Sequence, residues 1–242
     1  MSMRLFCLPY AGGSARVFAG WADGLPAAVE VCPLELPGRG LRFHEEPADR
    51  LEPVVADLIG AVLSRAELPF AVLGYSYGAL LGFELARRLE RYHGLRAEHL
   101  VVAAMRAPTW PRPEDPVSAL SDAQFRRRLA VLGGTPPEVL ANDALMEIMI
   151  PILRADFTVV DTYRYQGAAP LTCPVTTFGG LDDDTVPCAA LDAWRHCTTG
   201  PFARHTLPGG HFFLRTAQDE LLARLGAALD TVTLTTTGRG TR

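Results

Sequence analysis

Short apolar runs, typical of buried strands, alternate with amphipathic helical segments along most of this chain. The strand-like runs are RLFCL (4–8), EVCPLEL (30–36), FAVLGY (70–75), HLVVAAM (99–105), PVTTFGG (174–180) and ARHTL (203–207). Segments with the 3.6-residue period of a helix lie between most of them, at 49–66, 78–92, 189–197 and 217–229. Because helices that connect parallel strands cover both faces of a sheet, this alternation predicts an α/β fold with a mostly parallel sheet flanked by helices.

One long segment interrupts the alternation. Residues 107–165 contain no clear strand, and a Pro-rich loop is followed there by helical stretches, the first with a plausible N-cap at Ser121 or Asp122. Open α/β sheets bind ligands at the carboxyl ends of their strands, so we expect this insertion to form a helical lid there. Residues 1–230 are then a single domain, and the polar residues 231–242 are expected to form a disordered tail.

Composition excludes several classes of protein. The 242 residues carry a net charge of −4, without the basic surplus that nucleic-acid binding needs, and all 23 basic residues are Arg. Without Lys, neither a Schiff base nor a P-loop is available. The five cysteines form no C-x-x-C pair, and the apolar charge-free run Leu68–Phe83 is too short for a membrane span. We therefore expect a cytoplasmic, monomeric protein with no metal site that binds neither nucleic acid nor membrane.

Ser76 lies in the sequence GYSYG, at the joint between the strand-like run 70–75 and the helical segment 78–92. A serine hydroxyl is a poor nucleophile unless a base and an oxyanion site assist it. The G-x-S-x-G turn exposes the serine Oγ and directs the next backbone N–H, that of Tyr77, at the developing charge, while Gly74 and Gly78 relieve the crowding. The alternative is an ordinary strand-to-helix turn that happens to contain a serine.

A nucleophilic serine of this kind is followed along the chain by an acid and then a histidine. His211 follows the turn LPGG after the last strand-like run, whereas His196 falls in a helical segment and His205 within a strand. We therefore expect His211 to be the base. The acid is expected in the loop LDDDTVP, where the residues alone leave Asp182, Asp183 and Asp184 open and slightly favour the last two.

The second oxyanion donor is expected in the loop after the first strand. That loop is LPYAGGS (8–14), and the backbone N–H of Ala11 is our candidate. The alternative is a Gly-rich turn with no catalytic role.

Taken together, these motifs resemble the type II thioesterases that accompany polyketide and nonribosomal peptide synthases. The resemblance spans about residues 4–229 and rests on LFCLPYAGGSARVFAGW, LPGRGLRFHEEP, GYSYGAL, RAPTWP, IPILRADF, CPVTTFGGLDDDTVP and LPGGHFFL, in this order. It implies an α/β-hydrolase fold. It also implies an enzyme that hydrolyses stalled or mis-primed acyl chains from the 4′-phosphopantetheine thiol of acyl or peptidyl carrier proteins, with no cofactor of its own.

The resemblance also implies roles for individual residues. The family pattern G-G-x-x-D falls on Asp183, and G-G-H-F-F falls on His211. Ser76 matches the nucleophile, and the N–H groups of Ala11 and Tyr77 match the oxyanion donors. One departure is present, since the family commonly has G-H-S-M-G where this chain has a tyrosine on each side of the serine.

Other functions remain open at this level. A stand-alone acyl-CoA or fatty-acid thioesterase would use the same chemistry, and an acyltransferase would replace water by an alcohol or amine. A non-catalytic binding protein with a hydrolase fold usually lacks part of the Ser-His-Asp set, which this chain keeps. The run FRRRL (125–129) is either a contact for an acidic carrier protein or, by preference, a solvated helix face.

Overall fold

The computed structural model describes residues 2–65, 67–111, 115–167 and 169–237, with side chains as far as residue 230. Six strands form one sheet in the order β2-β1-β3-β4-β5-β6, and every neighbouring pair is parallel. The strands are β1 (Met3–Leu8), β2 (Val29–Pro33), β3 (Phe70–Tyr75), β4 (His99–Ala103), β5 (Val175–Gly180) and β6 (Phe202–Leu207). The parallel sheet predicted from the alternation is therefore confirmed, with strand boundaries within two residues of those expected except at the end of β2, which stops three residues before the end of the expected run.

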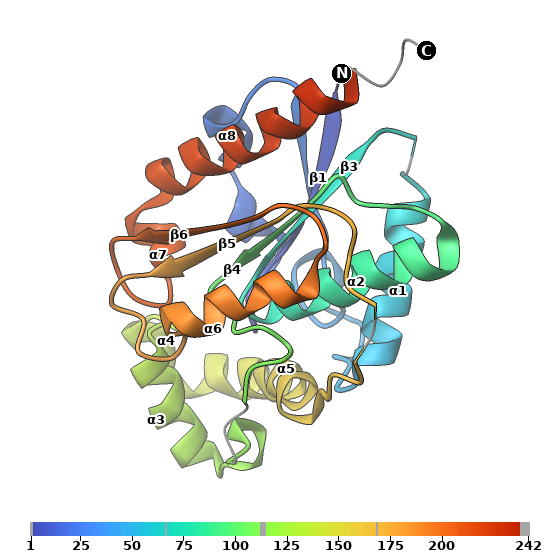
Figure 1. Ribbon diagram of the computed structural model, residues 1–242. Coiled ribbons are helices and arrows are strands. Elements are labelled where there is room, and N and C mark those ends of the chain that lie inside the picture. Colours follow the sequence, from blue (N-terminus) through green and yellow to red (C-terminus); the bar gives the residue numbers. More distant parts are fainter. Residues whose placement is uncertain (1, 66, 112–114, 168, 238–242) are drawn as a thin grey trace.

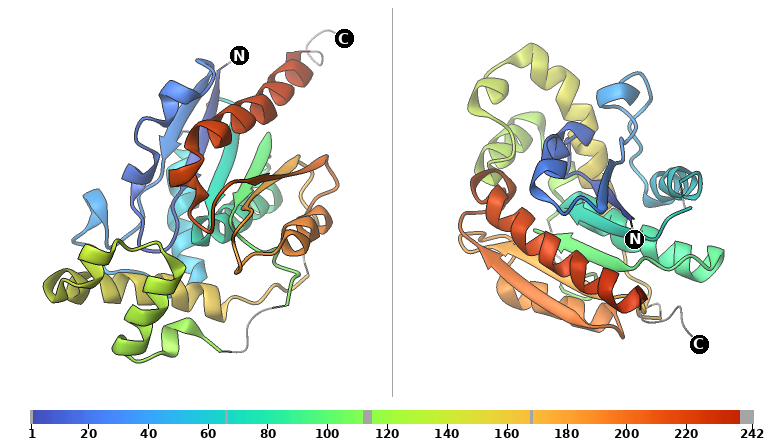
Figure 2. Two further views of the ribbon diagram at one scale, coloured as in Figure 1. Left: turned by 90° about the vertical axis from the view of Figure 1, so that its left-hand side faces the viewer. Right: turned by 90° about the horizontal axis from the view of Figure 1, so that it is seen from above.

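Helices cover both faces of the sheet (Figures 1 and 2). On one face, α1 (Leu51–Leu63), α2 (Tyr77–His93) and the turn η5 (Ala193–Cys197) after α6 (Cys188–Asp192) contribute to one apolar core. On the other face, the turns η1 (Ala15–Phe18) and η2 (Trp21–Gly24) and the helix α8 (Gln218–Thr237) contribute to a second core. The two cores on opposite faces explain why β1, β3 and β4 are almost continuously apolar.

The insertion between β4 and β5 is helical, as predicted. It contains η4 (Val117–Ala119), α3 (Asp122–Leu132, capped by Ser121), α4 (Pro137–Leu140) and α5 (Asp143–Thr162). The lid has a small core of its own, formed by Phe125, Leu129, Met146, Ile150 and Leu153. Figures 1 and 2 place it at the opposite end of the molecule from the start of β1 and the end of α8, beside the carboxyl ends of the strands.

The structure differs from the sequence prediction at the end of the chain. Helix α8 runs through residues 231–237, for which the sequence predicts a disordered tail. Once the packed part of a helix has formed, adding further residues costs little free energy. The Thr residues that dominate this stretch are less favourable in a helix than Ala by at most about 0.7 kcal/mol each. Residues 238–242 of the predicted tail lie outside the described part. Among the described residues, no helix is both long and apolar enough to cross a membrane.

Candidate active site

Ser76 occupies a sharp turn between β3 and α2. Its backbone has φ 51° and ψ −116°, a conformation that costs a residue with a side chain about 1–3 kcal/mol. Its N–H donates to the carbonyl oxygen of Ala103 at 2.8 Å, which fixes the turn to β4. A Cβ on Gly74 would lie 2.1 Å from the carbonyl oxygen of Gly78, so the turn closes only because Gly74 has no side chain.

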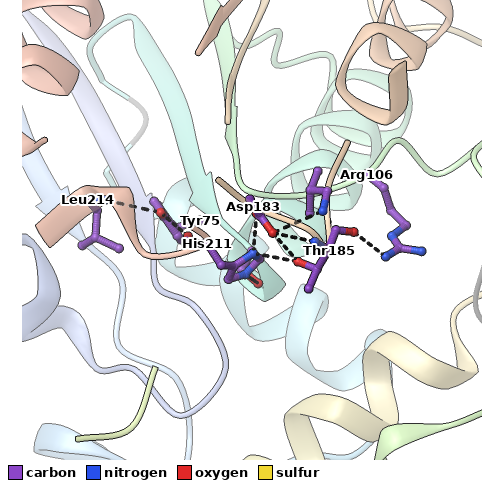
Figure 3. A network of polar contacts seen from close by, with 8 residues as sticks. Tyr75, Arg106, Asp183, Thr185, His211 and Leu214 are labelled. Atoms are coloured by element: carbon purple, nitrogen blue, oxygen red, sulfur yellow. Dashed lines mark hydrogen bonds and ion pairs between the residues drawn. The ribbon is translucent and has the colours of Figure 1, made fainter. Parts of the chain in front are cut away.

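His211 and Asp183 lie beside Ser76. His211 follows β6 and comes before the short helix α7 (Phe213–Thr216), and Asp183 lies in the loop after β5. The Nε2 of His211 is 3.0 Å from the Oγ of Ser76. The Nδ1 of His211 is 2.7 Å from Oδ2 of Asp183, and Figure 3 shows this second contact. The three side chains thus form the hydrogen-bonded chain that a serine, a base and an orienting carboxylate require.

Asp183 alone among the three consecutive aspartates is buried, and both of its neighbours are exposed. Its Oδ1 accepts hydrogen bonds from the N–H and hydroxyl of Thr185 and from the N–H of Val186, at 2.8, 2.6 and 3.2 Å. Burial alone would raise the pKa of Asp183, but hydrogen bonding and charge attraction from His211, together with the bonds from Thr185, hold it below its usual value. Asp183 therefore stays ionised at neutral pH.

Ala11 and Tyr77 lie on adjoining segments at the same cavity. Tyr77 is the first residue of α2, so its N–H belongs to the helix-terminal donors that have no partner within the helix. Ala11 lies in a turn closed by a hydrogen bond from Gly13 N–H to the Tyr10 carbonyl at 2.9 Å. A Cβ on Gly78 would lie 2.2 Å from the carbonyl oxygen of Leu8, which shows how closely α2 approaches the loop with Ala11.

The cavity lies between the sheet edge and the lid. Its volume is about 260 Å³, and Ser76 and His211 line it together with lid residues that include Leu129, Leu153 and Phe157. A serine hydroxyl beside a histidine, in a partly apolar cavity next to the lid, is suited to attack a carbonyl carbon whose apolar chain is enclosed.

The thioesterase domain family model matches residues 3–229. This chain belongs to that family. GrsT, the gramicidin S biosynthesis protein of Aneurinibacillus migulanus, is 40% identical to this thioesterase domain over 220 residues, which cover 91% of this chain and 86% of GrsT.

Solved thioesterases have the same fold. The thioesterase RedJ from the prodiginine biosynthetic pathway in Streptomyces coelicolor superposes with a TM-score of 0.88 at 39% identity, covering 93% of this chain and 89% of RedJ. The type II thioesterase BorB from the borrelidin biosynthetic cluster superposes with a TM-score of 0.85 at 35% identity, covering 94% and 92%. The fold of this thioesterase domain is therefore that of the α/β-hydrolases.

The side chain of Tyr75, directly before Ser76, is hydrogen-bonded to the loop of His211 in this thioesterase domain. Its hydroxyl donates to the backbone carbonyl oxygen of His211 at 2.6 Å and accepts from the N–H of Leu214 at 3.4 Å (Figure 3). Burial raises the pKa of Tyr75 well above its usual value, so the phenol keeps its proton and remains a donor. The sequence marked Tyr75 only as a departure from the family pattern, and its contact with the loop of His211 could not be found from sequence.

The arginines of the run FRRRL (125–129) have different surroundings, so neither a carrier-protein contact nor a solvated helix face describes all three. Arg126 pairs with Asp143 at 2.5 Å, and Arg127 is exposed. Arg128, in contrast, lines the cavity.

The other two histidines considered from sequence lie apart from Ser76, since His196 is exposed in η5 and His205 stacks on Phe178. Within the described residues, no cluster of three or more His, Cys, Asp or Glu side chains could hold a metal ion.

Proposed function

We propose that this chain is a type II thioesterase that hydrolyses stalled or incorrect acyl chains from the phosphopantetheine thiol of carrier proteins. The observation that carries the proposal is the hydrogen-bonded series Ser76–His211–Asp183 at a cavity beneath a helical lid. The relatives support the choice of thioester substrate, because RedJ and BorB are named as thioesterases of biosynthetic pathways.

The proposed reaction begins when His211, oriented by Asp183, accepts the proton of Ser76. The Oγ then bonds to the thioester carbonyl carbon, and the N–H groups of Ala11 and Tyr77 bind the oxyanion. Collapse of this intermediate breaks the carbon–sulfur bond, and the His211 proton leaves with the pantetheine thiol. Water, deprotonated by His211, then attacks the acyl-serine, releasing a carboxylic acid and restoring Ser76. Every step uses groups of the chain, the substrate and water, so the proposal includes no metal or cofactor.

The proposed partner is an acyl or peptidyl carrier protein whose pantetheine arm enters the cavity beside the lid. Arg106, Arg128 and Arg164 are among the residues that line the cavity. Guanidinium groups bind phosphate well, so these residues suit a substrate that bears a phosphodiester next to its pantetheine arm. The segment 107–165 would then act as a lid over the acyl chain.

Ser76→Ala tests the chemistry. We expect kcat for hydrolysis of acyl-pantetheine thioesters to fall by about 10³-fold or more. Ser64→Ala is the matched control. Ser64 is an exposed residue directly after α1, so this variant also loses a serine hydroxyl, but at a position outside the cavity. Near wild-type hydrolysis by the Ser76 variant would refute the proposal.

The choice of carrier is tested separately with the wild-type protein. The same acyl group is presented on a carrier protein and on coenzyme A, and the products are identified. A higher kcat/KM on the carrier protein with free acid as product is the expected result. A preference for the coenzyme A thioester, or an ester or amide product, would favour a stand-alone acyl-CoA thioesterase or an acyltransferase.

A further inference from the structure

A buried ion pair joins the lid helix α5 to two loops of the main domain. Asp156, near the middle of α5, is completely buried, and Arg39, in the loop after β2, is only 5% exposed. The Nη1 and Nη2 of Arg39 donate to Oδ2 and Oδ1 of Asp156 at 2.5 and 2.9 Å. Two charges are rarely removed from water in this way without further hydrogen bonds to compensate.

The further hydrogen bond to Asp156 comes from the loop of the candidate oxyanion donor. The backbone N–H of Gly12 donates to Oδ2 of Asp156 at 2.7 Å. Gly12 directly follows Ala11 and has φ +74°, so its position determines how the turn that contains Ala11 is closed. The carboxylate of Asp156 therefore binds Arg39 and the oxyanion loop at the same time.

Helix α5 also packs on this loop through Leu153. A Cβ on Gly12 would lie 2.5 Å from Cδ2 of Leu153, one helical turn before Asp156. Residues three apart lie on the same face of a helix, so Leu153 contacts the loop from the face whose carboxylate binds it. The far end of the loop is fixed differently, because the N–H of Ala15 donates to Oε1 of Glu35 at 3.0 Å. Asp156 is thus the acceptor that the lid supplies.

The charges of the same pair also act on the side chain of Tyr77, the residue whose N–H is the second candidate donor. Burial, followed by the nearby charge of Asp156, raises the pKa of the Tyr77 side chain well above its usual value, and the charge of Arg39 opposes this. A carboxylate alone would repel an oxyanion, whereas a carboxylate paired with a guanidinium provides an acceptor for Gly12 with little net charge.

We propose that Asp156, paired with Arg39, is a positioning residue of this thioesterase: it holds the Ala11–Gly12 turn so that the Ala11 N–H points at the oxyanion. The lid helix thereby becomes part of the support of the oxyanion site as well as a cover for the acyl chain. This inference rests on the proposed function, since it needs an oxyanion at Ser76. Preorganised donors act on charge that develops in the transition state, so loss of Asp156 should lower kcat more than it raises KM.

Two variants test the proposal. Asp156→Asn removes the charge and disturbs the acceptor of Gly12, and the double variant R39M/D156L removes the acceptor while leaving no charge buried. If Asp156→Asn does not fold, the double variant is measured in its place, because apolar replacements of buried ion pairs are often well tolerated. Asp122→Asn is the matched control, since Asp122 pairs with Arg154 of α5 at 2.6 Å but is 71% exposed.

The readout is the affinity for two ligands with the same alkyl chain on pantetheine. The carbonyl carbon of a trifluoromethyl ketone bonds to the Ser76 Oγ, the Ser76 proton passes to His211, and the ketone oxygen becomes an oxyanion. The matching thioether has no carbonyl and cannot react in this way. For both Asp156 variants we expect the Ki of the ketone to rise at least about 10-fold, in parallel with the fall in kcat, while the Kd of the thioether changes less than about threefold. Asp122→Asn should bind both ligands like the wild type.

Wild-type ketone affinity in a folded Asp156 variant would overturn the proposal, as would an equal loss of affinity for the ketone and the thioether. The proposed function fails on a different measurement, namely absence of hydrolysis of acyl-pantetheine by the wild-type protein. Ketone affinity does not require turnover, so the two failures can be distinguished.

Discussion

Tyr75→Phe removes one oxygen atom from behind the candidate base. That oxygen donates to the His211 carbonyl at 2.6 Å and accepts from Leu214 N–H at 3.4 Å, and Tyr75 is completely buried. The ring should stay in place, because it packs between Phe212, with centroids 6.5 Å apart, and Phe213, with centroids 5.2 Å apart. The variant therefore isolates the hydrogen bond that fixes the backbone of His211.

The size of the effect follows from what the carbonyl loses. Removing one partner of a buried hydrogen bond costs about 1–3 kcal/mol, and each kcal/mol lowers the Tm of a domain of this size by about 2–4 °C. The Nε2 of His211 must remain near 3.0 Å from Ser76 Oγ for proton transfer. If poorer alignment of His211 raises the activation free energy by about 1.4 kcal/mol, kcat falls about 10-fold. KM should stay within about twofold, because the acyl cavity is unchanged.

Steady-state kinetics on an acyl-pantetheine thioester and thermal unfolding of the same preparations measure both effects. Tyr163→Phe is the matched control: its buried hydroxyl donates to Oε1 of Glu84 at 2.8 Å, away from Ser76. We expect this control to lose stability but keep kcat. If Tyr75→Phe kept the wild-type kcat, or if Tyr163→Phe lowered kcat equally, the phenol of Tyr75 would not position His211.

Three further predictions concern the same site. In Gly78→Ala the new Cβ would lie 2.2 Å from the Leu8 carbonyl oxygen and should abolish hydrolysis, whereas Gly60→Ala, where a Cβ meets nothing within 4 Å, should keep activity and raise the Tm. Both Ser76→Gly and Ser76→Ala should be inactive, but the glycine variant should be more stable by about 1 kcal/mol in chemical unfolding, because only glycine relieves the strain at φ 51°. The pKa of Asp183 is lowered in the folded state, so its ionised carboxylate stabilises the fold. This stabilisation is fully present above the unfolded pKa of about 3.9 and is lost as the pH falls through the folded pKa. The Tm advantage of the wild type over Asp183→Asn should therefore be constant above about pH 5 and shrink below about pH 4. Equal stability of the two Ser76 variants, or a pH-independent Tm difference, would contradict the last two.

The sheet and the turn at Ser76 were predictable because local sequence determines them. Strand β3 was expected at 70–75 and occupies Phe70–Tyr75, since a short apolar run between a proline and a glycine-rich turn has few alternative secondary structures. Gly74 and Gly78 marked the turn because only glycine fits the observed approach of the backbone atoms. Chain order, together with its place in a turn after a strand, then separated His211 from the other histidines, and the structure places its ring beside Ser76.

The supports of the site were not predictable, because they join residues that are distant in sequence. Arg39 and Asp156 are 117 residues apart, and Tyr75 and His211 are 136 apart. One signal was present for the ion pair: Asp156 lies on the same helical face as Leu153 and Val159, which are both buried. A carboxylate on an apolar helix face requires a buried partner, but the sequence does not say which cation provides it.

Each element of the candidate site is fixed by a side chain from another part of the fold. The loop of His211 is held by Tyr75 on β3, and the loop of Asp183 by Arg106 after β4, whose Nη2 donates to the Thr185 carbonyl at 2.7 Å (Figure 3). The turn with Ala11 differs, because its acceptor Asp156 belongs to the lid. Substitutions that shift α5 should therefore change kcat through the oxyanion donor, whereas substitutions on lid residues that only line the cavity should act mainly on KM. A scan of α5 that found no such division between Asp156 and Phe157 would show that the lid covers the acyl chain without helping to hold the oxyanion site.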